Sequence, residues 1–149
     1  MGNSDSQPPI PPGSTVTMWP SQILFTHDSI SPNFQDGRCL TETYDDIVYK
    51  RLDPSTRSIH PLVVTYHNGK WWVIRGNRRL YLYKDLEKRR FVREVLVTTE
   101  LFDEALYNRQ FSSRTHGASA RVRGAPNFDR ELDRIIQKWN RENGGCAIM

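Results

Sequence analysis

Two β-prone runs around an Asn-Gly pair constrain the fold of this chain more than any other feature. Residues 62–66 and 71–74 consist almost entirely of β-branched, aromatic and other apolar side chains, and Asn68-Gly69 lies between them. Such runs favour strands, and Asn-Gly between them is the strongest local signal for a hairpin with a tight turn. The sequence therefore predicts an antiparallel strand pair near the middle of the chain.

Hydrophobic periodicity predicts further elements on both sides of this hairpin. The expected elements are a strand at 22–26, a helix at 40–52, a helix at 78–86, a strand at 91–97 and a helix at 101–110. A chain of 149 residues has room for one such domain. The order of elements predicts an α+β fold over residues 21–110, a small mixed sheet with packed helices.

The rest of the chain is expected to be a tail, a linker and a helix. Residues 1–20 contain five prolines, so we expect a disordered or extended tail. Residues 111–126 are rich in Ser, Gly, Ala and Arg and contain no acid, which is typical of a flexible linker.

Residues 127–149 begin with a basic amphipathic helix. Its apolar face comprises Phe128, Leu132, Ile135, Ile136 and Trp139. We expect this face to dock on the domain, because acids interrupt the basic residues; the alternative is a helix lying in a membrane interface.

The net charge of +4 comes from the C-terminal third of the chain. Residues 1–104 hold 13 basic and 13 acidic side chains, whereas residues 105–149 hold eight and four. This distribution favours attraction to an anionic membrane surface, with ordinary solubility charge as the alternative. The balanced charge of residues 1–104 makes nucleic acid a less favoured partner.

Both ends of the sequence carry patterns typical of lipidation. Cys146-Ala147-Ile148-Met149 reads as a prenylation box, and Gly2 with Ser6 fits N-myristoylation, provided that the source is eukaryotic. No apolar stretch approaches the length of a membrane span, and the start lacks the pattern of a signal peptide. We therefore expect a cytoplasmic protein that becomes peripheral to the cytosolic face of a membrane when lipidated.

The junction after the hairpin, Gly76-Asn77-Arg78-Arg79, is the candidate ligand-binding site. A helix start presents unpaired N–H groups, Gly allows close approach of a ligand, and paired arginines can fork onto phosphate oxygens. Ser29 and Ser31 are further candidates to bind those oxygens. The alternative for the arginine pair is a solvated helix face.

Residues 67–81, with the elements around them, resemble the ParB/sulfiredoxin superfamily over about residues 22–110. In ParB-like proteins this junction reads Gly-Glu-Arg-Arg and contacts nucleotide phosphates; in sulfiredoxins it reads Gly-Cys-His-Arg, and the Cys is the reaction centre. Gly76, Arg78 and Arg79 match the phosphate-contacting pattern. The resemblance thus implies a bound nucleotide or other phosphorylated ligand, with Mg²⁺ accompanying a nucleotide. Asn77 replaces the reactive residue, which argues against sulfiredoxin activity and nucleotide hydrolysis.

Three functions follow as alternatives. The first is a lipid-anchored domain that binds a nucleotide or phosphorylated ligand, with phosphoryl transfer or hydrolysis left open. The others are a non-catalytic membrane-associated module with a protein partner, and a ParB-like nucleic-acid binder or nuclease. His27 and Asp28 are candidates for an acid–base pair, with a turn-forming role as the alternative for Asp28. No Cys, His or carboxylate spacing indicates a metal site.

Overall fold

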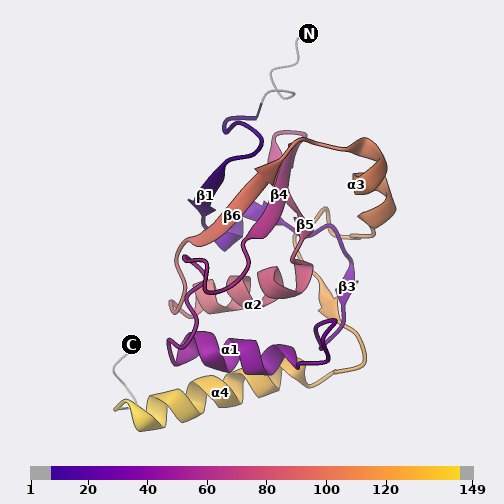
Figure 1. The fold of residues 1–149 in the computed structure, drawn as a ribbon. Coiled ribbons are helices and arrows are strands. Elements are labelled where there is room, and N and C mark those ends of the chain that lie inside the picture. The colour runs from indigo at the N-terminus through magenta and orange to yellow at the C-terminus, as the bar shows by residue number, and fades with distance from the viewer. Residues whose placement is uncertain (1–7, 145–149) are drawn as a thin grey trace.

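The computed structural model describes residues 8–144 and has an α+β fold (Figure 1). The strands are β1 (Thr15–Met18), β2 (Ile23–Leu24), β3 (Ser29–Ile30), β4 (Leu62–His67), β5 (Lys70–Arg75), β6 (Val95–Glu100) and β7 (Arg121–Val122). The helices are the 3-10 turn η2 (Pro20–Gln22), α1 (Leu40–Val48), α2 (Asn77–Lys88), α3 (Glu104–Gln110) and α4 (Phe128–Glu142).

A mixed five-stranded sheet in the order β1-β6-β4-β5-β2 forms one side of the molecule. The β1/β6 and β4/β5 pairs are antiparallel, and the β6/β4 and β5/β2 pairs are parallel. The predicted hairpin is confirmed as β4 and β5, with φ of 54° at Asn68 and 74° at Gly69 in its two-residue turn. The predicted class, a small mixed sheet with helices packed on it, is also confirmed.

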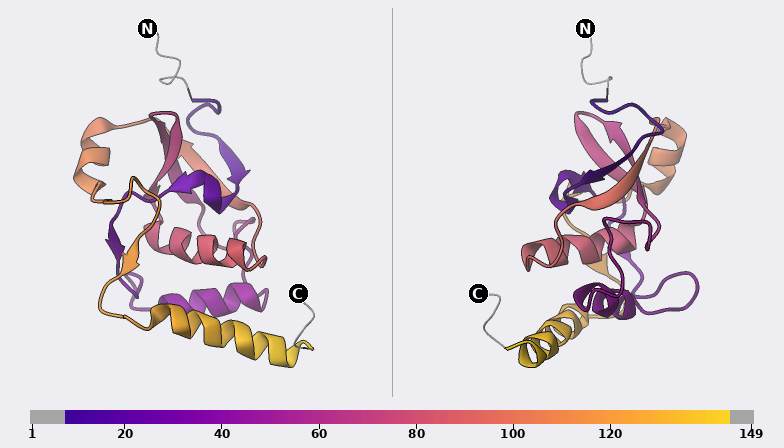
Figure 2. Two further views of the ribbon diagram at one scale, coloured as in Figure 1. Left: turned by 180° about the vertical axis from the view of Figure 1, so that it is seen from behind. Right: turned by 60° about the vertical axis from the view of Figure 1, so that its left-hand side comes forward.

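Helices α2, α1 and α4 are stacked one after another below the sheet, and α3 lies beside the hairpin end (Figures 1 and 2). The α2 side chains Leu80, Leu82 and Leu86 are fully buried between the sheet and α1. Burial of aliphatic side chains contributes about 1.5–3 kcal/mol each before the entropy cost of ordering them. This shared core fixes the N-terminal end of α2 against the ends of β4 and β5.

Several predicted boundaries are corrected by long-range contacts. Residues 1–20 are not all a disordered tail, because β1 pairs with β6 and Met18 is buried. Residues 1–7 lie outside the described part. The strand predicted at 91–97 is β6 instead, beginning at Val95, and the helix predicted to reach residue 52 ends at Val48.

The predicted flexible linker, residues 111–126, is wrong: this segment, called the strap below, is bound along residues 25–30. Its Gly117 carbonyl accepts from Phe25 N at 2.9 Å, and Arg123 N donates to the Ile30 carbonyl at 2.8 Å. Strands β3 and β7 pair in parallel between these points. A Cβ atom on Gly117 would lie 2.7 Å from Trp72 Cζ3, so the strap passes too close to the sheet for a larger residue. Backbone hydrogen bonds and close packing therefore order a strap that carries few large apolar side chains.

The prediction that the apolar face of the C-terminal helix docks on the domain is confirmed. Phe128, Leu132 and Ile136 of α4 are buried, and the helix packs on α1. The alternative, in which this face enters a membrane interface, is not compatible with the docked arrangement. Within residues 8–144, no helix combines the length and apolar character needed to cross a bilayer.

Candidate functional site

A cleft of about 710 Å³ opens beside the first turn of α2. Clefts of roughly 300–1,000 Å³ are typical of small-molecule sites. Its walls come from the junction between β5 and α2, from residues 27–36, from residues 59–60 and from the strap. All predicted ligand-binding residues line it, namely Ser29, Ser31, Gly76, Asn77, Arg78 and Arg79, and the candidate His27 lines it as well.

Gly76 is required at the junction for conformation and for space. It has φ of 114° and ψ of 26°, a left-handed conformation that residues with a side chain rarely adopt. A Cβ atom there would lie 2.4 Å from Cδ2 of the buried Leu62. Gly76 is also the N-cap of α2, and no side chain among the described residues caps this helix. The positive end of the α2 dipole therefore faces the cleft without a competing cap.

Asn77 lines the cleft but its side chain is held by the protein. Its Oδ1 accepts from the backbone N–H groups of Thr26 at 3.1 Å and His27 at 3.2 Å. Its Nδ2 donates to Thr26 Oγ1 at 3.0 Å, and only 5% of the residue is exposed. Thr26 Oγ1 in turn donates to the Val73 carbonyl. The structure thus makes Asn77 a clamp between α2 and residues 26–27, which corrects the predicted role of its side chain as a ligand contact.

Four arginines line the cleft, and they differ in how far the protein engages them. The guanidinium groups of Arg75 and Arg78 make no hydrogen bond or ion pair with any residue in the range 8–144, so both are free for a ligand. Arg79 donates from Nη1 to the His60 carbonyl, which ties its guanidinium to residues 59–60. Arg123 donates from Nη1 to Ser29 Oγ at 3.1 Å and to the Ser29 carbonyl at 3.2 Å.

The electrostatics of the cleft favour an anion. Asp36 is the one carboxylate in its described lining, against four arginines. The pKa of His27 is lowered from 6.5 by burial first and then by the positive charges of Arg123 and Arg78. His27 is therefore a neutral imidazole near pH 7. A bound anion would favour its protonated form.

The predicted acid–base pair of His27 and Asp28 is not formed. His27 lines the cleft, whereas the Asp28 carboxylate lies 3.5 Å from Arg121 Nε and 3.8 Å from Arg114 Nε in the strap. Asp28 directly precedes β3, and its carbonyl accepts from Arg121 N at 3.0 Å, which places its carboxylate beside the arginines of the strap. Asp28 therefore contacts the strap and has a structural role, as the turn-forming alternative for this residue also proposed.

Part of the cleft lining is apolar. Ile30, Phe34, Ile59 and Ile74 line it together with the charged groups, and Ile30 and Ile74 are almost fully buried. Ser31 also lines the cleft, and its Oγ accepts from Asn33 N at 3.1 Å. A lining with both charged and apolar groups suits a ligand with one anionic part and one organic part.

Sequence reasoning missed several contributions to the cleft. Arg123 was assigned to a flexible linker, and residues 59–60 follow a turn with no local signature. For Arg123, no local pattern in the strap indicates its position, because the β3/β7 pairing that delivers it joins residues about 90 apart in sequence. Arg75, directly before Gly76, is the one missed residue that proximity to the predicted junction would have found.

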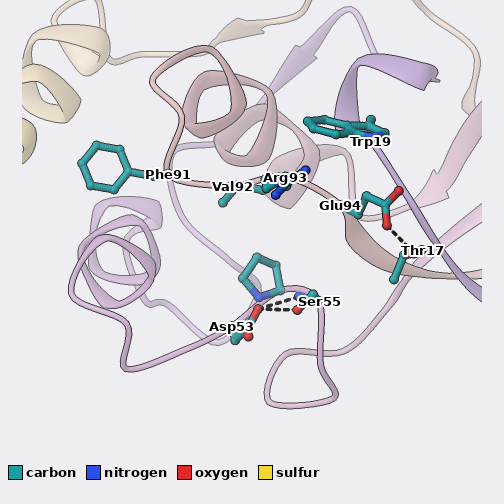
Figure 3. A pocket seen from close by; sticks show the side chains of 9 residues that line it. Thr17, Trp19, Asp53, Ser55, Phe91, Val92, Arg93 and Glu94 are labelled. Atoms are coloured by element: carbon teal, nitrogen blue, oxygen red, sulfur yellow. Dashed lines mark hydrogen bonds between the residues drawn. The ribbon is translucent and has the colours of Figure 1, made fainter. Parts of the chain in front are cut away.

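A second hollow of about 390 Å³ lies near the C-terminal end of α2 (Figure 3). Its polar groups largely bind one another: Thr17 Oγ1 donates to Glu94 Oε1 at 2.9 Å, and Arg93 lies over the Trp19 ring. None of the predicted site residues lines it. We therefore assign the candidate site to the cleft at the N-terminal end of α2.

Comparison with known proteins gives no family for this chain: no family model matches it, and no curated protein matches it significantly. Within residues 8–144, no group of three or more His, Cys, Asp and Glu side chains is placed to hold a metal ion. Gly2 and Cys146, the predicted lipidation sites, lie outside the described residues.

Proposed function

We propose that the cleft binds a phosphorylated small molecule, with a nucleotide as the leading candidate. The single observation that carries this proposal is the convergence of four arginines from two distant segments on one cleft at an uncapped helix N-terminus. Guanidinium groups pair with phosphate in bidentate geometry, and backbone N–H groups at a helix start add to the same attraction. The apolar residues of the lining, such as Phe34 and Ile59, suit the organic part of such a ligand.

The resemblance to the ParB/sulfiredoxin superfamily supports the same assignment, since Gly76, Arg78 and Arg79 match its phosphate-contacting pattern. With a nucleotide, Mg²⁺ would be held mainly by the ligand phosphates, because the described lining offers one carboxylate.

One observation favours binding without turnover. Asn77 occupies the position at which the resembled families carry a reactive residue, and its amide is buried and hydrogen-bonded. A side chain so engaged cannot act as a nucleophile or general base. A non-catalytic module that recognises a phosphorylated ligand is therefore the second candidate function.

Ligand-dependent melting tests the proposal. A panel of nucleoside mono-, di- and triphosphates, pyrophosphate and sugar phosphates is added to the full chain with and without Mg²⁺. A ligand that binds the folded state raises the midpoint, by about 2.7 kcal/mol of added stability at 100 times Kd. Arg78→Ala and Arg123→Ala should abolish the shift, whereas Arg109→Ala, on the exposed side of α3, should retain it.

The outcome that overturns the proposal is a panel without any shift, or a shift that survives both cleft substitutions. Hydrolysis of the bound compound, measured as release of inorganic phosphate, distinguishes turnover from binding alone.

The lipid anchor stays a separate prediction. Cys146→Ser should move the protein from the membrane fraction to the soluble fraction of eukaryotic cells. Mass spectrometry of the intact protein would detect both the prenyl and the myristoyl group.

A further inference from the structure

The outer face of α4 carries a basic stripe that the docked arrangement leaves exposed. Arg130, Arg134, Lys138 and Arg141 are all exposed, and their side chains make no hydrogen bond or ion pair with the part of the chain from 8 to 144. At 3.6 residues per turn these four positions fall within an arc of roughly 80°, turned away from the buried Leu132. Figures 1 and 2 show α4 as the outermost layer, with no other element beyond it.

Docking also gives three of the four acids of α4 partners on the domain. Tyr81 donates to Asp129 Oδ1 at 2.7 Å, and Tyr49 donates to Glu142 Oε1 at 2.5 Å. Asp133 accepts from Arg89, the C-cap residue of α2. Three of the four acids are thus bound to the domain, and Glu131 alone remains exposed without such a partner among the described residues. Most of the acids that made a membrane contact unattractive from sequence are therefore engaged by the domain, and Glu131 is the one beside the stripe whose side chain is not engaged by the described residues.

We propose that the outer face of α4 docks on an anionic membrane surface through this basic stripe. The contact is electrostatic and superficial, because the apolar face of α4 is buried on α1 and cannot insert. A single straight stripe of cations suits a plane of anionic headgroups, where each basic residue raises the affinity about fivefold. A nucleic acid fits less well, since Trp139 packs edge-on against Phe91 and is not displayed as a stacking platform.

The stripe ends five residues before Cys146 in the sequence. One lipid chain binds a membrane only marginally, and a polybasic patch is one of the second signals that make attachment stable. The docking face nevertheless acts without any lipid, so it can be tested on the unmodified chain and does not depend on the ligand in the cleft.

The test is co-sedimentation of the unmodified full chain with phosphatidylcholine vesicles, with and without phosphatidylserine. We expect binding only to the phosphatidylserine vesicles and its loss at high salt. Arg134→Gln with Lys138→Gln should lower the partition coefficient about 25-fold, the product of two fivefold effects. The matched control, Lys70→Gln with Arg109→Gln, removes the same charge at the hairpin end and should leave the partition coefficient unchanged.

Three results overturn the proposal. They are failure of the wild-type chain to bind phosphatidylserine vesicles at low salt, equal loss of binding in the control pair, and retention of RNA by the stripe without vesicle binding. Unchanged melting midpoints of both variants establish that the altered residues act at the surface and not through folding.

Discussion

Replacing Asn77 by Ala should destabilise the fold strongly, because this side chain is a clamp. The substitution leaves the N–H groups of Thr26 and His27 without their acceptor, and Thr26 is fully buried. An unsatisfied buried N–H costs about 1–3 kcal/mol. His27 is half-buried and lines the open cleft, so an unpaired N–H costs less there, and the total loss is about 2–4 kcal/mol.

Urea unfolding of the full chain, monitored by tryptophan fluorescence and circular dichroism, measures this loss. At about 4 °C per kcal/mol, the same change lowers the melting midpoint by roughly 8–16 °C. Asn108→Ala is the matched control, because Asn108 is exposed on α3 and its replacement should change stability by less than about 0.5 kcal/mol.

One pair of results would refute the structural role of the Asn77 side chain. If Asn77→Ala unfolds within about 0.5 kcal/mol of wild type and instead loses the response to phosphorylated ligands, the amide faces the ligand. Asn77→Asp adds a second check, since it keeps an acceptor for both N–H groups but places an oxygen against Thr26 Oγ1, whose proton goes to Val73. We expect its stability to lie between those of wild type and Asn77→Ala.

Three further predictions concern the junction, the cleft and the docked helix. Gly76→Ala should cost about 1–3 kcal/mol from the left-handed backbone alone, with more from the contact with Leu62, and an unchanged urea midpoint would contradict this geometry. Because the pKa of His27 is lowered, the unfolded chain takes up a proton at a higher pH than the folded one, so stability should fall as the pH drops below about 6.5. His27→Gln should remove that part of the pH dependence. Sulfate, which stays doubly charged through this range, should bind more tightly to the wild type as the pH falls, and equal pH dependence in the variant would exclude His27 as the titrating group. Leu132→Ala should cost about 2–5 kcal/mol, whereas Gln137→Ala on the exposed side should cost almost nothing; equal effects would mean that α4 is not docked in solution.

The hairpin and the C-terminal helix were predictable because their signals are local. Asn68-Gly69 fixes a two-residue turn between β-prone runs, and the spacing of Phe128, Leu132 and Ile136 defines one helix face. The candidate junction was also visible, since Gly76 and the arginines after it are contiguous. The strap was not, because its order comes from backbone pairing with residues far away in the chain.

Local sequence encodes the periodic elements, the turn between β4 and β5, and the residues of the glycine–arginine junction, since each depends on neighbours within a few positions. Long-range contacts in the folded chain bring Arg123 to this junction, turn Asn77 inward to residues 26–27, and give three of the four acids of α4 partners on the domain. Each of these depends on which distant groups complete a hydrogen bond or an ion pair when the chain is folded, and composition and spacing do not encode that choice locally.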